Sequence, residues 1–241
     1  MENKTTLNIL SIDLDYILAP CINLYNDFVF ASNPPQKIWD NLNSLRNIDS
    51  HISYDDENLK FIFDVFTFAL FNLKDRNNVT FATNHDAILF DLASKKYEKN
   101  TFNIFNIDHH HDIFYNENGR KEIDDYDNAG VSNWVWYLDK HKKIENYSWI
   151  CNPNSLFPQC EIKSIGKMNG CTKDKIPQIF DVKKWDYIFI CNSPHWFPRK
   201  YDVFFNMLID IYKNFTGNEI TVCENVFCPN GLSRPYPYDK R

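Results

Sequence analysis

The stretch TFNIFNIDHHHD, from Thr101 to Asp112, decides the fold of this chain. Its first half is rich in Phe and Ile, as expected of a buried strand in a parallel sheet, and its second half consists of metal-ligand side chains. Asp108, His110 and Asp112 follow at every second residue, so an extended chain would point all three to one side. Open α/β sheets bind ligands at the carboxyl ends of their strands, and we expect these groups to converge there. A solvated acidic and histidine-rich turn is the alternative interpretation.

A second pair of carboxylates follows the first predicted strand. Leu7–Ile12 has the apolar pattern of a short buried strand, and Asp13 and Asp15 come after it with Ser11 on the same face. Two carboxylates on one face repel each other unless a cation neutralises them. The sequence therefore favours a metal site over an Asp that only caps a following helix.

A single histidine occupies the same kind of position after another strand. Val79–Thr83 is predicted to be a strand and Ala87–Lys96 a helix, with His85 in the turn between them. The other candidate ligands also follow strands in this way. A lone histidine is normally structural, but this position, one strand before Asp108, favours a ligand.

The remaining pattern alternates between strand and helix. Further helices are predicted from Pro34-Pro35 to about Leu45, over Asn58–Lys74, from about Ala129 and over Tyr201–Phe215; further strands are predicted over Asn47–Tyr54, Tyr147–Cys151 and Trp185–Cys191. This alternation predicts an α/β fold, with three α/β/α layers around a mainly parallel sheet, in one domain spanning residues 1–241. Residues 152–182 are predicted to be an irregular excursion, such as a lid or substrate loop, and residues 223–241 an irregular tail.

The composition narrows the class of function. Hydrophobic residues make up 44% of the chain and aromatic residues 16%, which indicates a globular protein. The net charge of −6 speaks against a nucleic-acid surface. Without a basic leader or a long apolar run, we expect a cytoplasmic protein that does not contact membranes. Seven cysteines without CxxC spacing favour reduced thiols, although Cys223 and Cys228 could pair in an oxidising compartment.

The candidate ligands together form a set of four carboxylates and two imidazoles: Asp13, Asp15, His85, Asp108, His110 and Asp112. This set of oxygen and nitrogen donors suits a pair of Mn²⁺ ions, whereas thiolates would indicate zinc or iron–sulfur clusters. Two ions about 3.5–4 Å apart can share a hydroxide that is nucleophilic at neutral pH. The implied reaction is hydrolysis.

These motifs resemble those of the ureohydrolases, the arginase and agmatinase family. That family has a histidine after one strand, DxHxD after the next and SxDxDxxDP after a later one; here the matches are His85, Asp108–Asp112 and Ser11–Asp15. The order is permuted, because the family's last motif stands first in this chain. The chain thus resembles a circularly permuted arginase/deacetylase-like fold. In this it is similar to the peptide arginases of ribosomal-peptide (RiPP) maturation, which convert arginine in a peptide to ornithine and release urea.

The resemblance implies roles for the ligands and a partner. Asp108 and Asp13 would bridge two Mn²⁺ ions, His85 and Asp112 would complete one ion site, and His110 and Asp15 would complete the other. Asp112 would also orient the shared hydroxide. The implied partner is an arginine-containing peptide, such as a ribosomal precursor peptide.

The chain departs from the family pattern where substrate would bind. Leu18 replaces the third aspartate of SxDxDxxDP, and Gly130–Asn133 stands where arginases have a histidine. The family glutamate that grips the guanidinium falls near His51, which we take as a candidate catalytic residue together with Asp112. Candidate substrate contacts are Asn133, Trp134, Ser193 and His195, with Trp196 and Phe197 as further aromatic groups. His109 and His111 are expected in supporting or core positions, and His141 in solvent.

Two alternatives remain open. A deacetylase-like amidohydrolase would use one zinc with an Asp-His-Asp set, and the metal count separates it from a ureohydrolase. A non-catalytic binding protein would keep the sheet and use a metal only structurally. Unchanged activity in Asp13→Asn and Asp108→Asn variants would indicate that second alternative.

Overall fold

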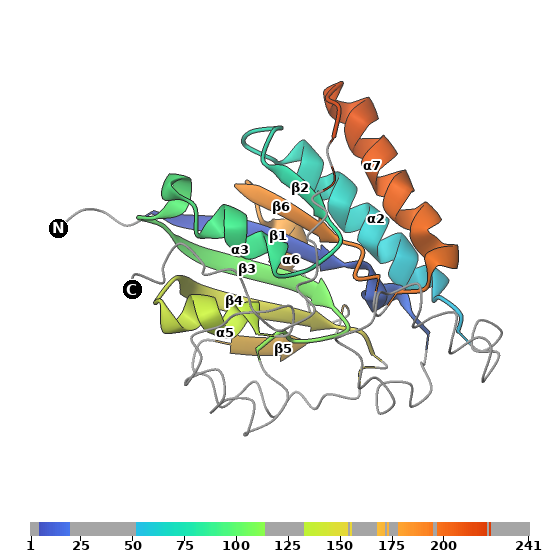
Figure 1. Cartoon of the computed structure of the whole chain (residues 1–241), viewed down its shortest axis with the longest axis horizontal. Coiled ribbons are helices and arrows are strands. Elements are labelled where there is room, and N and C mark those ends of the chain that lie inside the picture. The colour runs from blue at the N-terminus through green and yellow to red at the C-terminus, as the bar shows by residue number, and fades with distance from the viewer. Residues whose placement is uncertain are drawn as a thin grey trace, which may run out of the picture.

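The computed structural model describes residues 5–19, 52–113, 133–153, 155, 168–171, 173, 178–194, 197–220 and 222. A six-stranded sheet forms the centre, in the order β2-β6-β1-β3-β4-β5, and every neighbouring pair is parallel (Figure 1). The strands are β1 (Thr6–Asp13), β2 (Val79–Ala82), β3 (Thr101–Asp108), β4 (Ile144–Cys151), β5 (Met168–Cys171) and β6 (Tyr187–Cys191). The predicted α/β class with a parallel sheet is confirmed.

Helices cover both faces of the sheet. One face packs against α2 (Asp56–Phe71), α6 (Gln178–Asp181) and α7 (Asp202–Thr216), and the other against α3 (Ala87–Leu92) and α5 (Trp134–Lys140). The short 3₁₀ helices are η1 (Leu14–Ile17), η4 (Lys95–Tyr97) and η7 (Arg199–Tyr201). Two hydrophobic cores result, one on each face, consistent with three layers. None of the helices in the described ranges is long and apolar enough to cross a membrane.

The pleat of β1 divides its side chains between these two cores. Leu10 and Ile12 pack in the core beneath α2 and α7, and Ile9 packs in the core beneath α3 and α5. Because alternate residues share a face, Ser11 and Asp13 lie on the same side as Ile9. The hydrophobic pattern of the strand therefore decides on which face its polar end emerges.

The chain leaves β1 and β3 in opposite directions across the sheet. From β1 it passes through α2 to β2 at one edge, and from β3 it passes by way of α5 to β4, towards the other edge. In an open parallel sheet, such a reversal leaves a crevice at the carboxyl ends of the two strands, where ligands bind. The strand order alone thus favours a site beside Asp13 and Asp108.

Capping residues set the ends of the long helices. Asp55 accepts a hydrogen bond from the backbone N–H of Asn58 at 2.8 Å, so α2 begins at Asp56, two residues earlier than predicted. Gly217 follows α7 with φ of 73°, the left-handed conformation that glycine adopts readily after a helix.

The excursion over 152–182 was predicted to be irregular, and this prediction was wrong in part. It contains α6 and also β5, which pairs with β4 through Tyr147↔Met168 and Ile150↔Cys171. The sequence of β5, MNGC, has neither the alternation nor the β-branched residues that identify a strand. The edge position of β5 in the sheet, rather than its own propensity, makes it a strand.

Other expectations concern residues outside the described ranges. These are the helix ending near Leu45, most of the strand over Asn47–Tyr54, and the tail over 223–241 with Cys223 and Cys228. Within the described ranges, Cys151, Cys171 and Cys191 form no disulfide.

Candidate metal centre

Two groups of buried carboxylates and imidazoles lie at the carboxyl ends of β1 and β3. Asp13, His85 and Asp108 form the first group, and Asp15, Asp108 and His110 form the second. Within each group the ligand atoms lie within 4.8 Å of one another, and all five side chains are buried. Asp108 belongs to both groups, so the two possible ion sites are adjacent.

His85 presents one ring nitrogen to three carboxylates. Its Nδ1 lies 3.2 Å from Asp13 Oδ2, 3.2 Å from Asp108 Oδ2 and 2.9 Å from Asp112 Oδ2. Its Nε2 lies 2.7 Å from Ser11 Oγ. A ring with one nitrogen among carboxylates and the other held by a hydrogen bond has the arrangement of a metal-ligating histidine.

The ring of His85 reaches the centre across β6, because β2 and β1 are not neighbours. It stacks on Phe189 of β6 with a centroid distance of 5.6 Å and an interplanar angle of 7°. The ring of Trp134 of α5 lies 5.1 Å from that of His85, with the two planes tilted by 39°. These two aromatic contacts fix the plane of the imidazole.

Asp108 links the first group to the second. Its Oδ2 faces His85, whereas its Oδ1 lies 3.8 Å from Nδ1 of His110, which is also 2.8 Å from Asp15 Oδ2. Backbone groups hold these carboxylates: the N–H of His109 donates to Asp15 at 3.2 Å, and the N–H of His110 donates to Asp108 at 2.8 Å. Asp108 therefore presents its two oxygens to two different histidines.

The DxHxD stretch converges for a different reason from the one predicted. We expected it to remain extended, but β3 ends at Asp108 and Asp112 has φ of 51°, in the left-handed region. His110 and Asp112 thus approach Asp108 through a turn. A left-handed residue with a side chain costs roughly 1–2 kcal/mol. Contacts from α5 hold Asp112 in place, including the Val135 N–H, which donates to the Asp112 carbonyl at 3.2 Å.

The centre concentrates negative charge away from water. Burial, followed by the Asp112 and Asp13 carboxylates, raises the pKa of Asp108 to about 7. Burial lowers the pKa of His110, but Asp15 and Asp108 outweigh this effect and raise it to about 9. Burial also opposes protonation of His85, yet Asp112, Asp108 and Asp13 raise its pKa well above the ordinary value. Protons thus compensate a charge that a cation would otherwise neutralise.

The donor atoms fit divalent cations. Neither group contains a thiol, and the oxygen and imidazole donors suit Mn²⁺. Among the residues the structure covers, the buried His85 Nδ1 has no hydrogen bond of ordinary geometry, although three carboxylates surround it. A buried ring nitrogen that faces three carboxylates fits a bound cation.

Neutral hydrogen-bond donors orient the three carboxylates that face His85. Ser193 Oγ donates to Asp13 Oδ2, and Asn106 Nδ2 donates to Asp108 Oδ2 at 3.2 Å. Trp134 Nε1 donates to Asp112 Oδ2 at 2.6 Å. Ser193, like Asp112, has a positive φ, of 41°. The structure places Ser193 and the fully buried Trp134 against ligand carboxylates, whereas we expected both to contact substrate.

Strand β4 contributes two aromatic residues that the sequence analysis did not assign to the site. Trp149 Nε1 donates to the Asp108 carbonyl at 3.0 Å, and Tyr147 OH donates to the His111 carbonyl at 2.8 Å. Tyr147 OH also accepts from Asn106 Nδ2 at 3.1 Å. The sequence signal for these roles was the placement of a Tyr and a Trp at alternate positions of one strand. The polar atoms of buried Tyr and Trp side chains need hydrogen-bond partners.

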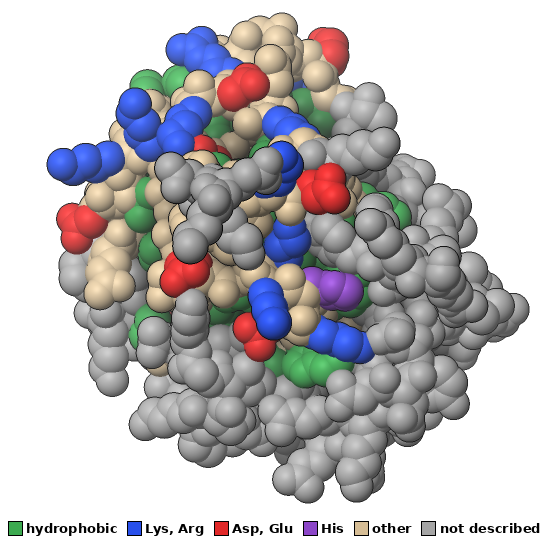
Figure 2. Space-filling model, turned by 90° about the vertical axis from the view of Figure 1, so that its left-hand side faces the viewer, with side chains coloured by type: hydrophobic (Ala, Val, Ile, Leu, Met, Phe, Trp, Pro, Cys, Tyr) green, Lys and Arg blue, Asp and Glu red, His purple; other side chains and the backbone are tan. Residues whose placement is uncertain are grey.

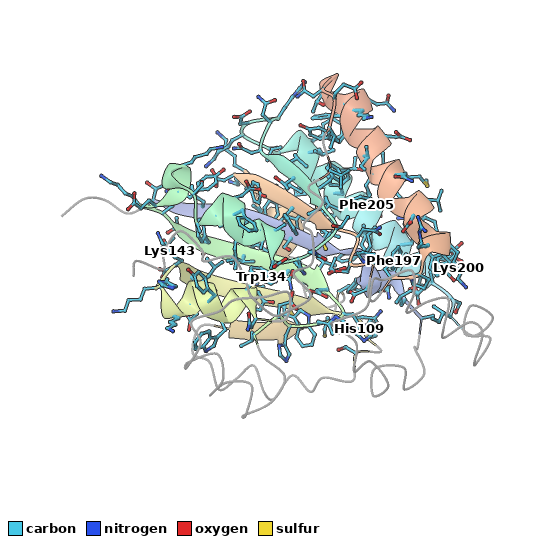
Figure 3. All side chains as sticks on the ribbon, in the orientation of Figure 1. His109, Trp134, Lys143, Phe197, Lys200 and Phe205 are labelled. Atoms are coloured by element: carbon cyan, nitrogen blue, oxygen red, sulfur yellow. The ribbon has the colours of Figure 1, made fainter. Side chains whose placement is uncertain are left out.

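The other predicted histidines differ in their surroundings. His109 and His111 are buried, and burial together with the charge of His110 lowers their pKa values to about 3 and about 4. Figure 3 shows His109 near the carboxyl ends of the strands, far from Lys143 near their amino ends. His141, expected in solvent, is half-buried, with its ring 4.4 Å from that of Tyr137.

Of the remaining candidate residues, the structure describes Asn133 and Phe197. Asn133 is buried at the start of α5, and Phe197 is fully buried in the core beneath α2 and α7. His51, His195 and Trp196 lie outside the described residues.

The two ends of the sheet differ in charge. The loops that enter the strands at their amino ends carry Lys and Arg residues: Lys74, Arg76, Lys96, Lys99, Lys142 and Lys143. Figure 2 shows Lys and Arg side chains at this end of the molecule, with Asp and Glu side chains among them. Carboxylates are interspersed there, as in the pair between Lys74 and Asp186 at 2.6 Å. At the carboxyl ends, buried aspartates dominate, so the local field there favours a cation.

Fold and site together define an α/β protein with a candidate metal centre at the carboxyl ends of the strands of a parallel sheet. No family model, curated protein or solved structure matches this chain. The chemistry of the centre is therefore inferred from its geometry and from its ureohydrolase-like motifs.

Proposed function

We propose that this protein is a hydrolase with two Mn²⁺ ions that removes urea from arginine side chains in a peptide, leaving ornithine. The observation that carries the proposal is the position of Asp108, with one oxygen toward His85 and the other toward His110. A carboxylate shared in this way is what a pair of bridged ions requires. The resemblance to ureohydrolases supplies the reaction class.

The residues divide between two ion sites. Asp13, His85, Asp108 and Asp112 would hold one ion, and Asp15, Asp108 and His110 the other. The resemblance implies that Asp13 would bridge as well. Asp108 has the stronger support as a shared ligand, because it belongs to both groups, whereas Asp13 belongs to the His85 group.

When bound, the ions would polarise the guanidinium and activate water at neutral pH. Asp112 would orient the attacking water, because its carboxylate is held at the centre by Trp134. Water adds to the guanidinium carbon, the bond from that carbon to the side-chain nitrogen breaks, and urea departs. The leaving nitrogen must gain a proton, for which His51 is our candidate donor.

Arginine within a peptide is favoured over free arginine by two features of the sequence. The permuted order of the metal motifs is the order of the peptide arginases that the chain resembles. In addition, Leu18 stands where free-arginine enzymes of the family carry an aspartate, and the segment Gly130–Asn133 stands where they carry a histidine.

One observation favours a second candidate function. Asp13, His85 and Asp108 by themselves form an Asp-His-Asp group, which would suffice for a deacetylase-like amidohydrolase with one zinc. Elemental analysis of the purified protein distinguishes the two candidates by metal count. One tightly held zinc per chain, with release of acetate from an acetyl-lysine peptide, would favour this second function.

The proposed function is tested by incubating the protein and Mn²⁺ with arginine-containing peptides and recording their masses. Conversion of arginine to ornithine lowers the mass by about 42 Da per residue, as follows from the reaction class. The Asp108→Asn variant should show no conversion. The Asp64→Asn variant, altered on the exposed face of α2, is the matched control and should remain active.

A further inference from the structure

We propose that Trp134 is a positioning residue of the metal centre, whose indole N–H fixes the carboxylate of Asp112 against His85. This inference rests on the metal binding of the proposed function but not on its substrate. Trp134 comes from α5, whereas the ligands come from β1, β3 and the segments that follow β1, β2 and β3. It would thus connect a helix of the outer layer to the ions.

The hydrogen bond is short and sheltered from water. Trp134 Nε1 donates to Asp112 Oδ2 at 2.6 Å, and the same oxygen lies 2.9 Å from His85 Nδ1. Trp134 is fully buried and Asp112 is 3% exposed. An indole can only donate, so it fixes the carboxylate without adding charge or competing for the ion. Hydrogen bonds to ionised carboxylates are among the stronger ones in proteins.

The first turn of α5 also holds the backbone of Asp112. The N–H of Val135 donates to the Asp112 carbonyl at 3.2 Å, next to the indole that holds the side chain. Asp112 has φ of 51°, which residues with a side chain keep only when their surroundings enforce it. Two neighbouring residues of α5 therefore fix both ends of one strained ligand.

Replacement of Trp134 by phenylalanine separates this hydrogen bond from packing. The rings of Trp134 and His85 lie 5.1 Å apart, and a phenylalanine would preserve an aromatic surface beside His85. What is lost is the N–H. Removing an outer partner of a metal ligand typically weakens metal affinity by about 10–100-fold.

The test is calorimetric titration of the metal-free Trp134→Phe protein with Mn²⁺, with thermal unfolding in parallel. We expect the affinity for one ion to fall by about 10–100-fold while the other ion binds as before. Trp185→Phe is the matched control: Trp185 is also fully buried, lies at the amino end of the sheet, and its Nε1 has no hydrogen-bond partner in the described part of the chain. This control should bind both ions unchanged.

Two further measurements make the inference falsifiable. If Trp134 acts through Asp112, then Trp134→Phe should cause no further loss of affinity in an Asp112→Ala background, whereas independent, additive losses would overturn the inference. In the wild-type protein, the Nε1–H resonance of Trp134 should shift on Mg²⁺ or Zn²⁺ binding, and an unshifted resonance with both ions bound would overturn it. Unchanged affinities in Trp134→Phe would do the same. By contrast, tight binding of two ions without peptide conversion would refute only the proposed function.

Discussion

Oδ2 of Asp108 lies 3.2 Å from Nδ1 of His85, although these residues follow strands β3 and β2, which are separated in the sheet by β1 and β6. The contact is possible because the turn after β2 carries the imidazole over Phe189 of β6. Candidate ligands from three segments of the chain therefore meet at the carboxyl ends of the central strands. The testable consequences concern which of them hold the ions.

Asp108→Asn should weaken the binding of both ions by more than about 100-fold, because it alters the ligand common to both groups. Asp15→Asn should weaken only one, because Asp15 belongs to the His110 group. Metal stoichiometry after dialysis measures both effects. Asp64→Asn should keep the wild-type stoichiometry. Equal losses in the Asp108 and Asp15 variants would contradict the division into two groups.

The metal-free protein should lose stability as pH rises from about 6.5 to 9, above the range in which the lowered pKa values of His109 and His111 have the opposite effect. Asp108 has its pKa raised from 3.8 to about 7, and His110 has its pKa raised from 6.5 to about 9. A raised pKa in the folded state stabilises the fold below the unfolded pKa, and this contribution disappears as pH passes through the folded pKa. Denaturant unfolding at several pH values, with a chelator present, measures the trend.

Mn²⁺ affinity should change in the opposite direction, because ions displace the protons held by Asp108 and His110. The increase in unfolding temperature caused by Mn²⁺ should therefore be larger at pH 8 than at pH 6. A metal-induced increase that is the same at both pH values would show that these groups do not bind the ions.

Ser11→Ala should lower both stability and metal affinity. Ser11 Oγ lies 2.7 Å from His85 Nε2, and without it a buried ring nitrogen lacks its partner. The loss should be about 1–3 kcal/mol in unfolding free energy and about tenfold in affinity for one ion. Chemical unfolding and calorimetry measure these changes. The exposed Ser53 provides the control, and a Ser11→Ala protein that matches Ser53→Ala in both quantities would refute the orienting role.

The candidate ligands could be predicted from sequence because they follow strongly apolar strands. Asp13 and Asp108 end β1 and β3, and the register that pairs Ile12 with Ile107 places both on one face. The left-handed turn at Asp112 could not be predicted, because aspartate does not signal a positive φ as glycine does. The roles of Trp134 and Trp149 were also not predictable, since they depend on packing between elements distant in sequence.

Strand β5 changes the expected effect of deletions in the excursion over 152–182. Shortening residues 155–178 would remove β5 and expose the edge of β4, which should destabilise the sheet. Parallel strands need a crossover of about a dozen residues, so a deletion that keeps β5 must be short. Removal of residues 158–161 alone leaves about a dozen residues between β4 and β5. We expect that shorter deletion to reduce peptide conversion much more than Mn²⁺ binding, as measured by mass spectrometry and calorimetry. Loss of Mn²⁺ binding in a folded 158–161 deletion would contradict the expectation that this segment serves the substrate.

The most direct measurement is anomalous scattering from crystals of the Mn²⁺-loaded protein. The proposed centre predicts two manganese peaks about 3.5–4 Å apart. One peak should lie beside His85 and the other beside His110, with the carboxylate of Asp108 between them. A single peak, or two peaks that do not share Asp108, would contradict a dinuclear centre at the carboxyl ends of these strands.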